Sequence, residues 1–173
     1  AVTTITIMNP QGAQMMNRPM GTYITIDSPD LRFFDPQIQK EISSIVAQKL
    51  KSLLNLTSTS TVLLVGLGNW NATPDALGPK IVEQSVVTRH LFQHAPEALS
   101  PGMSSVCAIA PGVLGITGIE TAEILKGVVE KVRPEVMIVI DALSAKSVDR
   151  IGSTIQIANT GISPVLHAGV RSI

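Results

Sequence analysis

The hydrophobic and polar positions of this chain change between a strand-like and a helix-like period along its length. Strand-like segments cover residues 2–8 and 21–26, where β-branched residues partly alternate with polar ones. A turn signal of Asn, Pro and Gly lies at residues 9–12. We therefore predict an antiparallel pair of strands joined by a long connection.

A long amphipathic helix is predicted to follow, up to residue 54. Asp35 suits its N-cap and Pro36 its first helical position. The apolar positions, at spacings of three and four on one face, are Ile38, Ile42, Ile45, Val46, Leu50, Leu53 and Leu54.

Three continuous apolar runs are typical of strands that are buried on both faces of a parallel sheet. They cover residues 61–65, 106–110 and 136–140. A fourth strand candidate covers residues 154–157.

Helices are predicted between the apolar runs. The first has Thr73 as N-cap, Pro74 at its first position and a kink near Gly78-Pro79, and continues to about His90. Residues 111–115 are predicted to be a loop.

The second helix is predicted to end near Val132 and to begin with a capping box of Thr117 and Glu120. The alternation of strands and helices predicts an α/β fold, with an open, mostly parallel sheet and helices on both faces. Residues 1–173 are expected to form a single domain that is incomplete at both termini.

Composition restricts the function classes. Apolar residues make up 45% of the 173 residues and charged residues 15%, as expected of a folded chain. Thirteen basic and thirteen acidic side chains give a net charge of zero and no basic patch, so we expect neither nucleic-acid nor membrane binding. The single cysteine, Cys107, cannot form an intrachain disulfide, fits a reducing compartment, and is expected to be a buried core thiol.

Candidate chemistry lies where two predicted parallel strands end. Asp75 follows the strand at 61–65 after a Gly-rich segment, and Asp141 directly follows the strand at 136–140. Ligands of open α/β sheets bind beyond the carboxyl ends of the strands, so the two carboxylates face one cleft if the strands are neighbours. Such a pair suits acid–base catalysis, with one carboxyl protonated and one ionised, or it holds a metal. Each aspartate also has a structural interpretation, at a helix start for Asp75 and as an acceptor of loop N–H groups for Asp141.

The other residues of this edge leave alternatives open. Gly66-x-Gly68 resembles the start of a dinucleotide fingerprint, but Asn71 stands where the third glycine would fall. Trp70 either lines a substrate groove or anchors the core. Glu120 is a capping residue or supports the site. No serine lies in a G-x-S-x-G elbow, which argues against a Ser-His-Asp hydrolase.

Several blocks, in order along the chain, resemble signatures of the germination protease family. They cover residues 66–79 (GLGNWNATPDALGP), 87–91 (VTRHL), 111–121 (PGVLGITGIET), 140–143 (IDAL) and 160–162 (TGI). The resemblance implies a fold similar to that of the hydrogenase-maturation proteases. It also implies an endopeptidase that degrades small acid-soluble spore proteins during germination, as an atypical aspartic protease with no cofactor and no catalytic metal.

On this resemblance the two essential aspartates are Asp75 and Asp141. Arg89 would supply a positive group near the cleft for acidic recognition sequences, with Trp70 and Glu120 as further substrate-binding candidates. A zymogen, a homotetramer and a cytoplasmic location in the spore core are also implied.

Two other hypotheses remain at this point. One is a metal-dependent maturation-type peptidase on the same fold. The other is an inactive, truncated fragment that only binds substrate, because residues 163–173 do not clearly follow the family pattern.

Overall fold

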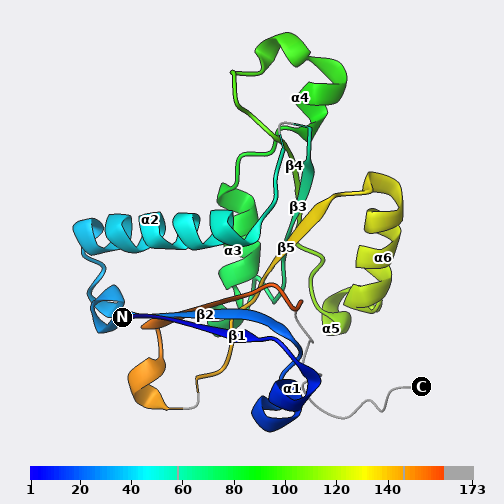
Figure 1. Ribbon diagram of the computed structural model, residues 1–173. Helices are drawn as coiled ribbons and strands as arrows, with labels where there is room; N and C mark the ends of the chain where they lie inside the picture. Colours follow the sequence, from blue (N-terminus) through cyan, green and yellow to red (C-terminus); the bar gives the residue numbers. More distant parts are fainter. Residues whose placement is uncertain (58, 146, 162–173) are drawn as a thin grey trace. The chain divides into compact units, whose positions relative to one another are not determined.

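The computed structural model describes residues 1–57, 59–145 and 147–161, so residues 163–173 lie outside the described residues (Figure 1). The chain divides into two compact units. Unit 1 contains residues 1–53 and the segment from 145 onward, and unit 2 contains residues 54–144. The expectation of a single domain stays a prediction.

Unit 1 contains an antiparallel sheet with the strand order β1-β2-β6 (Figure 1). Its strands are β1 (Val2–Ile7), β2 (Gly21–Asp27) and β6 (Thr154–Ala158). In β2, buried Ile24 and Ile26 alternate with half-buried Tyr23 and Thr25, as in a sheet with one covered face. The predicted antiparallel pair is therefore confirmed, and the fourth strand candidate joins this sheet rather than the parallel one.

The segment predicted as a turn at residues 9–12 instead begins helix α1 (Pro10–Met16). The side chain of Asn9 accepts the N–H of Gly12 at 2.8 Å, and Pro10 occupies the first helical position. Asn followed by Pro is a helix start as well as a turn signal, which is why the pattern misled.

The long helix α2 (Pro36–Leu53) follows the predicted bounds closely, after a 3₁₀ turn η1 (Pro29–Phe33). Oδ1 of Asp35 accepts the N–H groups of Gln37 at 2.8 Å and of Ile38 at 3.4 Å. The predicted N-cap is thus confirmed. A further 3₁₀ turn, η4 (Val148–Arg150), precedes β6.

Unit 2 contains a parallel sheet with the strand order β4-β3-β5. Its strands are β3 (Thr61–Gly66), β4 (Ser105–Ile109) and β5 (Val136–Ile140). Val62, Leu63 and Val65 of the central β3 are all buried, so both faces of this strand are covered. The connections from β3 to β4 and from β4 to β5 cross the sheet in opposite directions. Right-handed crossovers then place the helices of the two connections on opposite faces.

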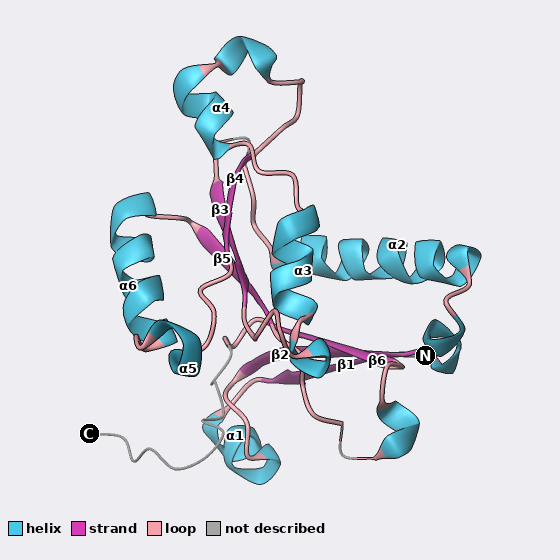
Figure 2. Ribbon diagram, turned by 180° about the vertical axis from the view of Figure 1, so that it is seen from behind, coloured by secondary structure: helices cyan, strands magenta, loops and turns pink. Residues whose placement is uncertain are grey.

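Figures 1 and 2 show that arrangement, with helix α3 (Leu77–Gln84) on one side of the three strands and helix α6 (Thr121–Val132) on the other. The predicted α/β class, with an open parallel sheet and helices on both faces, is confirmed. No helix within the described ranges has the length and apolar character needed to span a bilayer.

The helix predicted over residues 74–90 is wrong in its extent. Residues 73–75 form a 3₁₀ turn, η2 (Thr73–Asp75), which follows Ala72, so Thr73 is not the N-cap. The helix α3 ends at Gln84, and a separate helix α4 (Arg89–His94) begins after Thr88. The 3₁₀ turn η3 (Pro96–Ala98) follows α4.

The interruption has a tertiary cause. Thr88 is buried and pairs with β4: its N–H donates to the carbonyl oxygen of Val106 at 2.9 Å. Its hydroxyl accepts the N–H of Val106 at 2.9 Å and donates to the carbonyl oxygen of Ser104 at 2.6 Å. A residue bonded in this way to a strand edge cannot continue the helix.

The predicted capping box is also wrong. Thr117 ends a short helix, α5 (Leu114–Thr117), where a loop was expected, and Glu120 is itself the N-cap residue of α6, without a side-chain capping bond. Gly118 between them has φ = +69°, the left-handed conformation in which helices often end. Thr117 therefore does not cap α6, and its hydroxyl accepts the N–H of Ile119 at 3.1 Å.

Candidate active site

In the segment that joins β3 to α3, the backbones of Gly66 and Gly78 lie against each other. A Cβ atom at Gly66 would come 2.8 Å from Cγ2 of Val82, and one at Gly78 would come 2.6 Å from the backbone nitrogen of Leu67. Real Cβ atoms essentially never approach another atom closer than 3.0 Å, so neither position has room for a side chain. The start of α3 therefore packs directly on the backbone at the end of β3.

Gly68 and Asn69 both contact Asp75, and the N–H of Asn69 binds its carboxylate. Gly68 has φ = +118°, and a Cβ atom there would collide with the carbonyl oxygen of Asp75. The N–H of Asn69 donates to Oδ2 of Asp75 at 2.9 Å and to its carbonyl oxygen at 3.1 Å. The Asp75 side chain is half-buried. This link across six residues closes the loop.

Asn69 also organises the loop through its own side chain. Its Oδ1 accepts the N–H of Asn71 at 2.9 Å, and its carbonyl oxygen accepts the N–H of Ala72 at 3.1 Å. This is an Asx turn, in which a side-chain oxygen takes the place of a backbone acceptor. The reasoning from sequence did not identify Asn69 as a site residue. An Asn directly after the second glycine of a loop at a strand end is the signal that was available.

Asp141 reaches the same edge of the sheet through β5. β3 and β5 are parallel neighbours with Gly66 opposite Ile140, and the N–H of Leu67 donates to the carbonyl oxygen of Ile140 at 2.8 Å. Asp141 is the next residue and is half-buried. The expectation that the two strands are neighbours is confirmed, so both aspartates follow the carboxyl ends of adjacent parallel strands.

Trp70 and Glu120 lie at this edge as well. Trp70 is in the Asn69 turn and is 46% exposed, so it does not anchor the core. Glu120 lies in the connection that follows the carboxyl end of β4 and is exposed at the start of α6.

Arg89 is placed elsewhere. It begins α4 and lines a hollow of about 210 Å³ together with Val106 and Cys107 of β4. Because Thr88 pairs with Val106 near the start of β4, Arg89 lies toward the amino-terminal edge of the parallel sheet. Figure 1 shows α4 at that end of the strands. The structure thus groups Trp70 and Glu120 with the aspartates and separates Arg89 from them.

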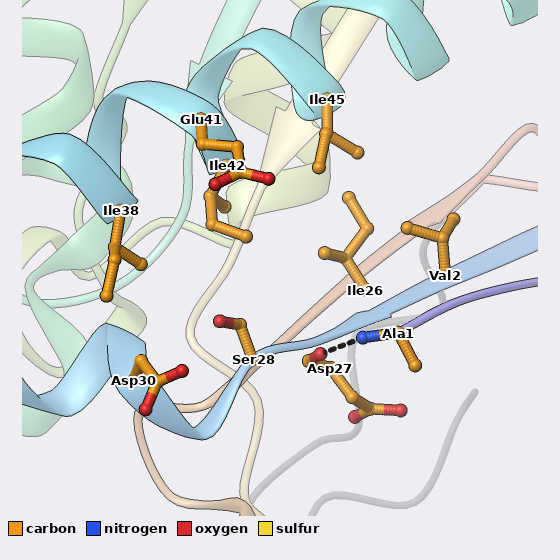
Figure 3. A pocket seen from close by; sticks show the side chains of 10 residues that line it. All are labelled: Ala1, Val2, Ile26, Asp27, Ser28, Asp30, Ile38, Glu41, Ile42 and Ile45. Carbon is orange, nitrogen blue, oxygen red and sulfur yellow. Dashed lines mark hydrogen bonds between the residues drawn. The ribbon is translucent and has the colours of Figure 1, made fainter.

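Unit 1 has a cavity of its own, of about 240 Å³, between α2 and β2. Figure 3 shows Ile42 and Ile45 of α2 on the side of Ile26 of β2, whereas Ile38 points towards Asp30. None of the five predicted site residues lines it. The carboxylate of Asp27 lies at its margin.

Asp27 has partners within its own unit. Its Oδ1 accepts bonds from the Thr154 hydroxyl at 2.8 Å and from Arg150 at 3.1 Å. The bond from Thr154, followed by that from Arg150, lowers the pKa of the Asp27 carboxyl. These contacts tie β6 and the turn before it to β2.

Among the described residues, no group of three or more His, Cys, Asp or Glu side chains is arranged to hold a metal ion. The Cys107 thiol is half-buried, not fully buried as predicted, and its partial burial raises its pKa. Within the described residues, the candidate acid–base groups are the carboxylates of Asp75 and Asp141.

Fold and site together define an α/β protein in which neighbouring parallel strands carry two aspartates to one edge of the sheet. Comparison with known proteins identifies the family. A model of peptidase family A25, described as germination protease, matches residues 1–172. This chain belongs to the germination protease family.

Curated relatives agree with this assignment. The germination protease of Clostridium perfringens (strain SM101 / Type A) is 53% identical over 97% of this chain and 52% of its own length. That of Caldanaerobacter subterraneus subsp. tengcongensis is 49% identical over 99% of this chain and 53% of its own length. The Bacillus subtilis (strain 168) protein is 46% identical over 89% of this chain and 43% of its own length. The chain thus spans about half the length of the curated relatives it matches.

Proposed function

We propose that this chain carries the catalytic aspartates of an endopeptidase that degrades small acid-soluble spore proteins during germination. The observation that carries the proposal is the position of the two aspartates in a chain of the germination protease family. Asp141 directly follows β5, and Asp75 lies in the segment after β3, the parallel neighbour of β5. That edge is where open α/β sheets bind their ligands.

In the proposed reaction, one aspartate is ionised and removes a proton from a water molecule as that water attacks the peptide carbonyl. The other aspartate is protonated and donates its proton to the carbonyl oxygen. Collapse of the tetrahedral intermediate breaks the C–N bond, and a proton passes to the departing amine.

The family resemblance extends the proposal. Trp70 and Glu120 would contact the substrate beside the aspartates. Synthesis as a zymogen, assembly into a homotetramer and a cytoplasmic location in the spore core are further parts of it. Light scattering on a size-exclusion column measures the assembly state, and a monomer at working concentration would contradict the tetramer.

The test of the proposed function is cleavage of a purified small acid-soluble spore protein, followed by mass spectrometry. Asp75→Asn and Asp141→Asn should each slow cleavage by about a hundredfold or more, the usual contribution of an acid–base group. Asp30→Asn is the matched control, because Asp30 is an exposed carboxylate of unit 1 and should leave the rate unchanged.

Each other outcome points to a different function. Cleavage undiminished in either variant would refute the two-aspartate assignment. Cleavage that stops with EDTA would indicate a metal-dependent peptidase on this fold. Binding of the substrate without cleavage by the parent chain would mean that this chain binds substrate but does not turn it over.

A further inference from the structure

The two carboxylate oxygens of Asp75 have different surroundings. Oδ2 accepts the N–H of Asn69 at 2.9 Å, whereas no hydrogen bond joins Oδ1 to another described residue. A hydrogen bond from a backbone N–H to an ionised carboxylate is charge-assisted, and its donor belongs to the main chain, so it restrains the position of the oxygen that accepts it. The side chain is thus held by Oδ2, while Oδ1 lies beside Gly68, 3.1 Å from where a Cβ atom of that residue would stand.

The Asn69 N–H is itself held in place by the side chain of Asn69. Oδ1 of Asn69 accepts the N–H of Asn71 at 2.9 Å, and this turn sets the orientation of the peptide that carries the Asn69 N–H. Gly68 contributes by lacking a side chain, since a Cβ atom there would collide with the backbone of Asp75 and push the two segments of the loop apart.

We propose that Asn69 is the positioning residue for Asp75. Its N–H fixes Oδ2, its side chain fixes that N–H through the turn to Asn71, and Oδ1 is the oxygen that faces the reacting water. This inference rests on the proposed function of Asp75. It concerns orientation only, because Asn69 acts through Asp75 and not on the substrate.

A spectroscopic test examines the contact itself in the full chain labelled with ¹⁵N. The amide proton of Asn69 should move upfield when acid protonates the Asp75 carboxylate and weakens the hydrogen bond that it accepts. This movement should disappear in Asp75→Asn and persist in Asp30→Asn. An Asn69 amide that does not respond while the Asp75 carboxyl carbon titrates would overturn the inference.

A kinetic test examines the consequence for the same cleavage reaction. Asn69→Ala should lower kcat by about tenfold, the effect of one lost hydrogen bond, with KM unchanged. Asn69→Ser keeps a side-chain acceptor for the turn and should restore kcat to within about threefold of the parent chain. Asn71→Ala, at an exposed position of the same turn, keeps the backbone donor and is the matched control.

The two tests separate this inference from the proposed function. Full activity of Asp75→Asn would refute the function, whatever the amide of Asn69 shows. Loss of activity in Asp75→Asn, combined with parental kcat in Asn69→Ala, would refute the positioning role alone. If Asn69→Ala fails to fold, the spectroscopic result on the parent chain still decides.

Discussion

Replacing Gly78 with alanine tests whether the start of α3 truly lies against the backbone of β3. The new Cβ atom would stand 2.6 Å from the nitrogen of Leu67 and 2.7 Å from the carbonyl carbon of Gly66, whereas ordinary contact begins at 3.4 Å. The backbone of α3 must then move away from the end of β3 by at least about 0.8 Å to reach ordinary contact. No flexible side chain is available to absorb that movement.

The cost follows from overpacking. Such insertions typically destabilise by 1–3 kcal/mol, and contact with backbone justifies the upper end, about 3 kcal/mol. Alanine in a helix recovers up to about 1 kcal/mol relative to glycine. We therefore expect Gly78→Ala to lower the free energy of unfolding by about 2 kcal/mol. For a chain of this size that corresponds to a fall in Tm of about 4–8 °C.

Gly127→Ala is the matched control. Gly127 lies in the middle of α6, and a Cβ atom there would meet nothing within 4 Å. The same substitution should therefore stabilise the protein by up to about 1 kcal/mol, so the two variants are expected to differ in sign.

Urea unfolding measures both variants. Circular dichroism follows the whole chain, and the fluorescence of Trp70, the one tryptophan in the sequence, follows unit 2. A Gly78→Ala protein as stable as the parent would refute the close approach of α3 to β3. The course of the loop that carries Asp75 would then need a different physical cause.

Three further predictions concern single side chains. Asp35→Ala should lower the free energy of unfolding by about 1 kcal/mol because α2 loses its N-cap, and Asp35→Ser should recover most of that loss. Urea unfolding that gives the same stability for the parent and both variants would contradict the cap. The pKa of the Asp27 carboxyl is lowered in the folded protein, so its bonds to Thr154 and Arg150 stabilise the fold above the unfolded-state pKa, and this stabilisation is lost as the pH falls through the folded-state pKa. The difference in free energy of unfolding between the parent and Asp27→Asn should therefore shrink in acid. A difference that stays constant with pH would refute the pairing. The raised pKa of the Cys107 thiol predicts slower alkylation by iodoacetamide at neutral pH than in the urea-unfolded chain, and equal rates would show that the thiol is not protected.

The strands of the parallel sheet were predictable because their signal is local. A run such as residues 136–140 contains no polar residue at all, which is typical of a parallel strand. Burial on both faces was predicted for all three runs and holds for the central β3, whereas β5 is an edge strand in which Met137 is 46% exposed. The helix α2 was predictable for the same reason, since Asp35 and the apolar face both lie within the segment itself.

The predicted helix bounds were wrong where contacts between residues far apart in the sequence, or the backbone conformation of a glycine, determine where a helix ends. Nothing near Thr88 in the sequence shows that it bonds to the edge of β4, so the helix predicted to continue to His90 could not be divided correctly. The spacing of Thr117 and Glu120 fitted a capping box, but Gly118 takes the left-handed conformation and separates two helices.

The candidate site shows the same division between local and distant causes. That Asp75 and Asp141 would reach one edge followed from a general property of parallel sheets, because each aspartate comes after an apolar strand and the carboxyl ends of such strands share an edge. Arg89 was assigned to the cleft from the family resemblance alone, with no strand end to place it, and the structure puts it toward the opposite edge.

The orientation of Asp75 required more than strand order. It depends on a backbone N–H of Asn69, and every residue except proline has the same backbone donor, so no sequence pattern distinguishes this one. What the sequence does carry are the conditions for the contact: glycine at positions 66, 68 and 78, where a Cβ atom would collide with backbone, and a turn-forming side chain at Asn69. An aspartate in a loop that also has closely packed glycines and a turn-forming Asn is therefore better evidence for a carboxylate of fixed orientation than an aspartate alone. The same test can be applied to the segment after any parallel strand.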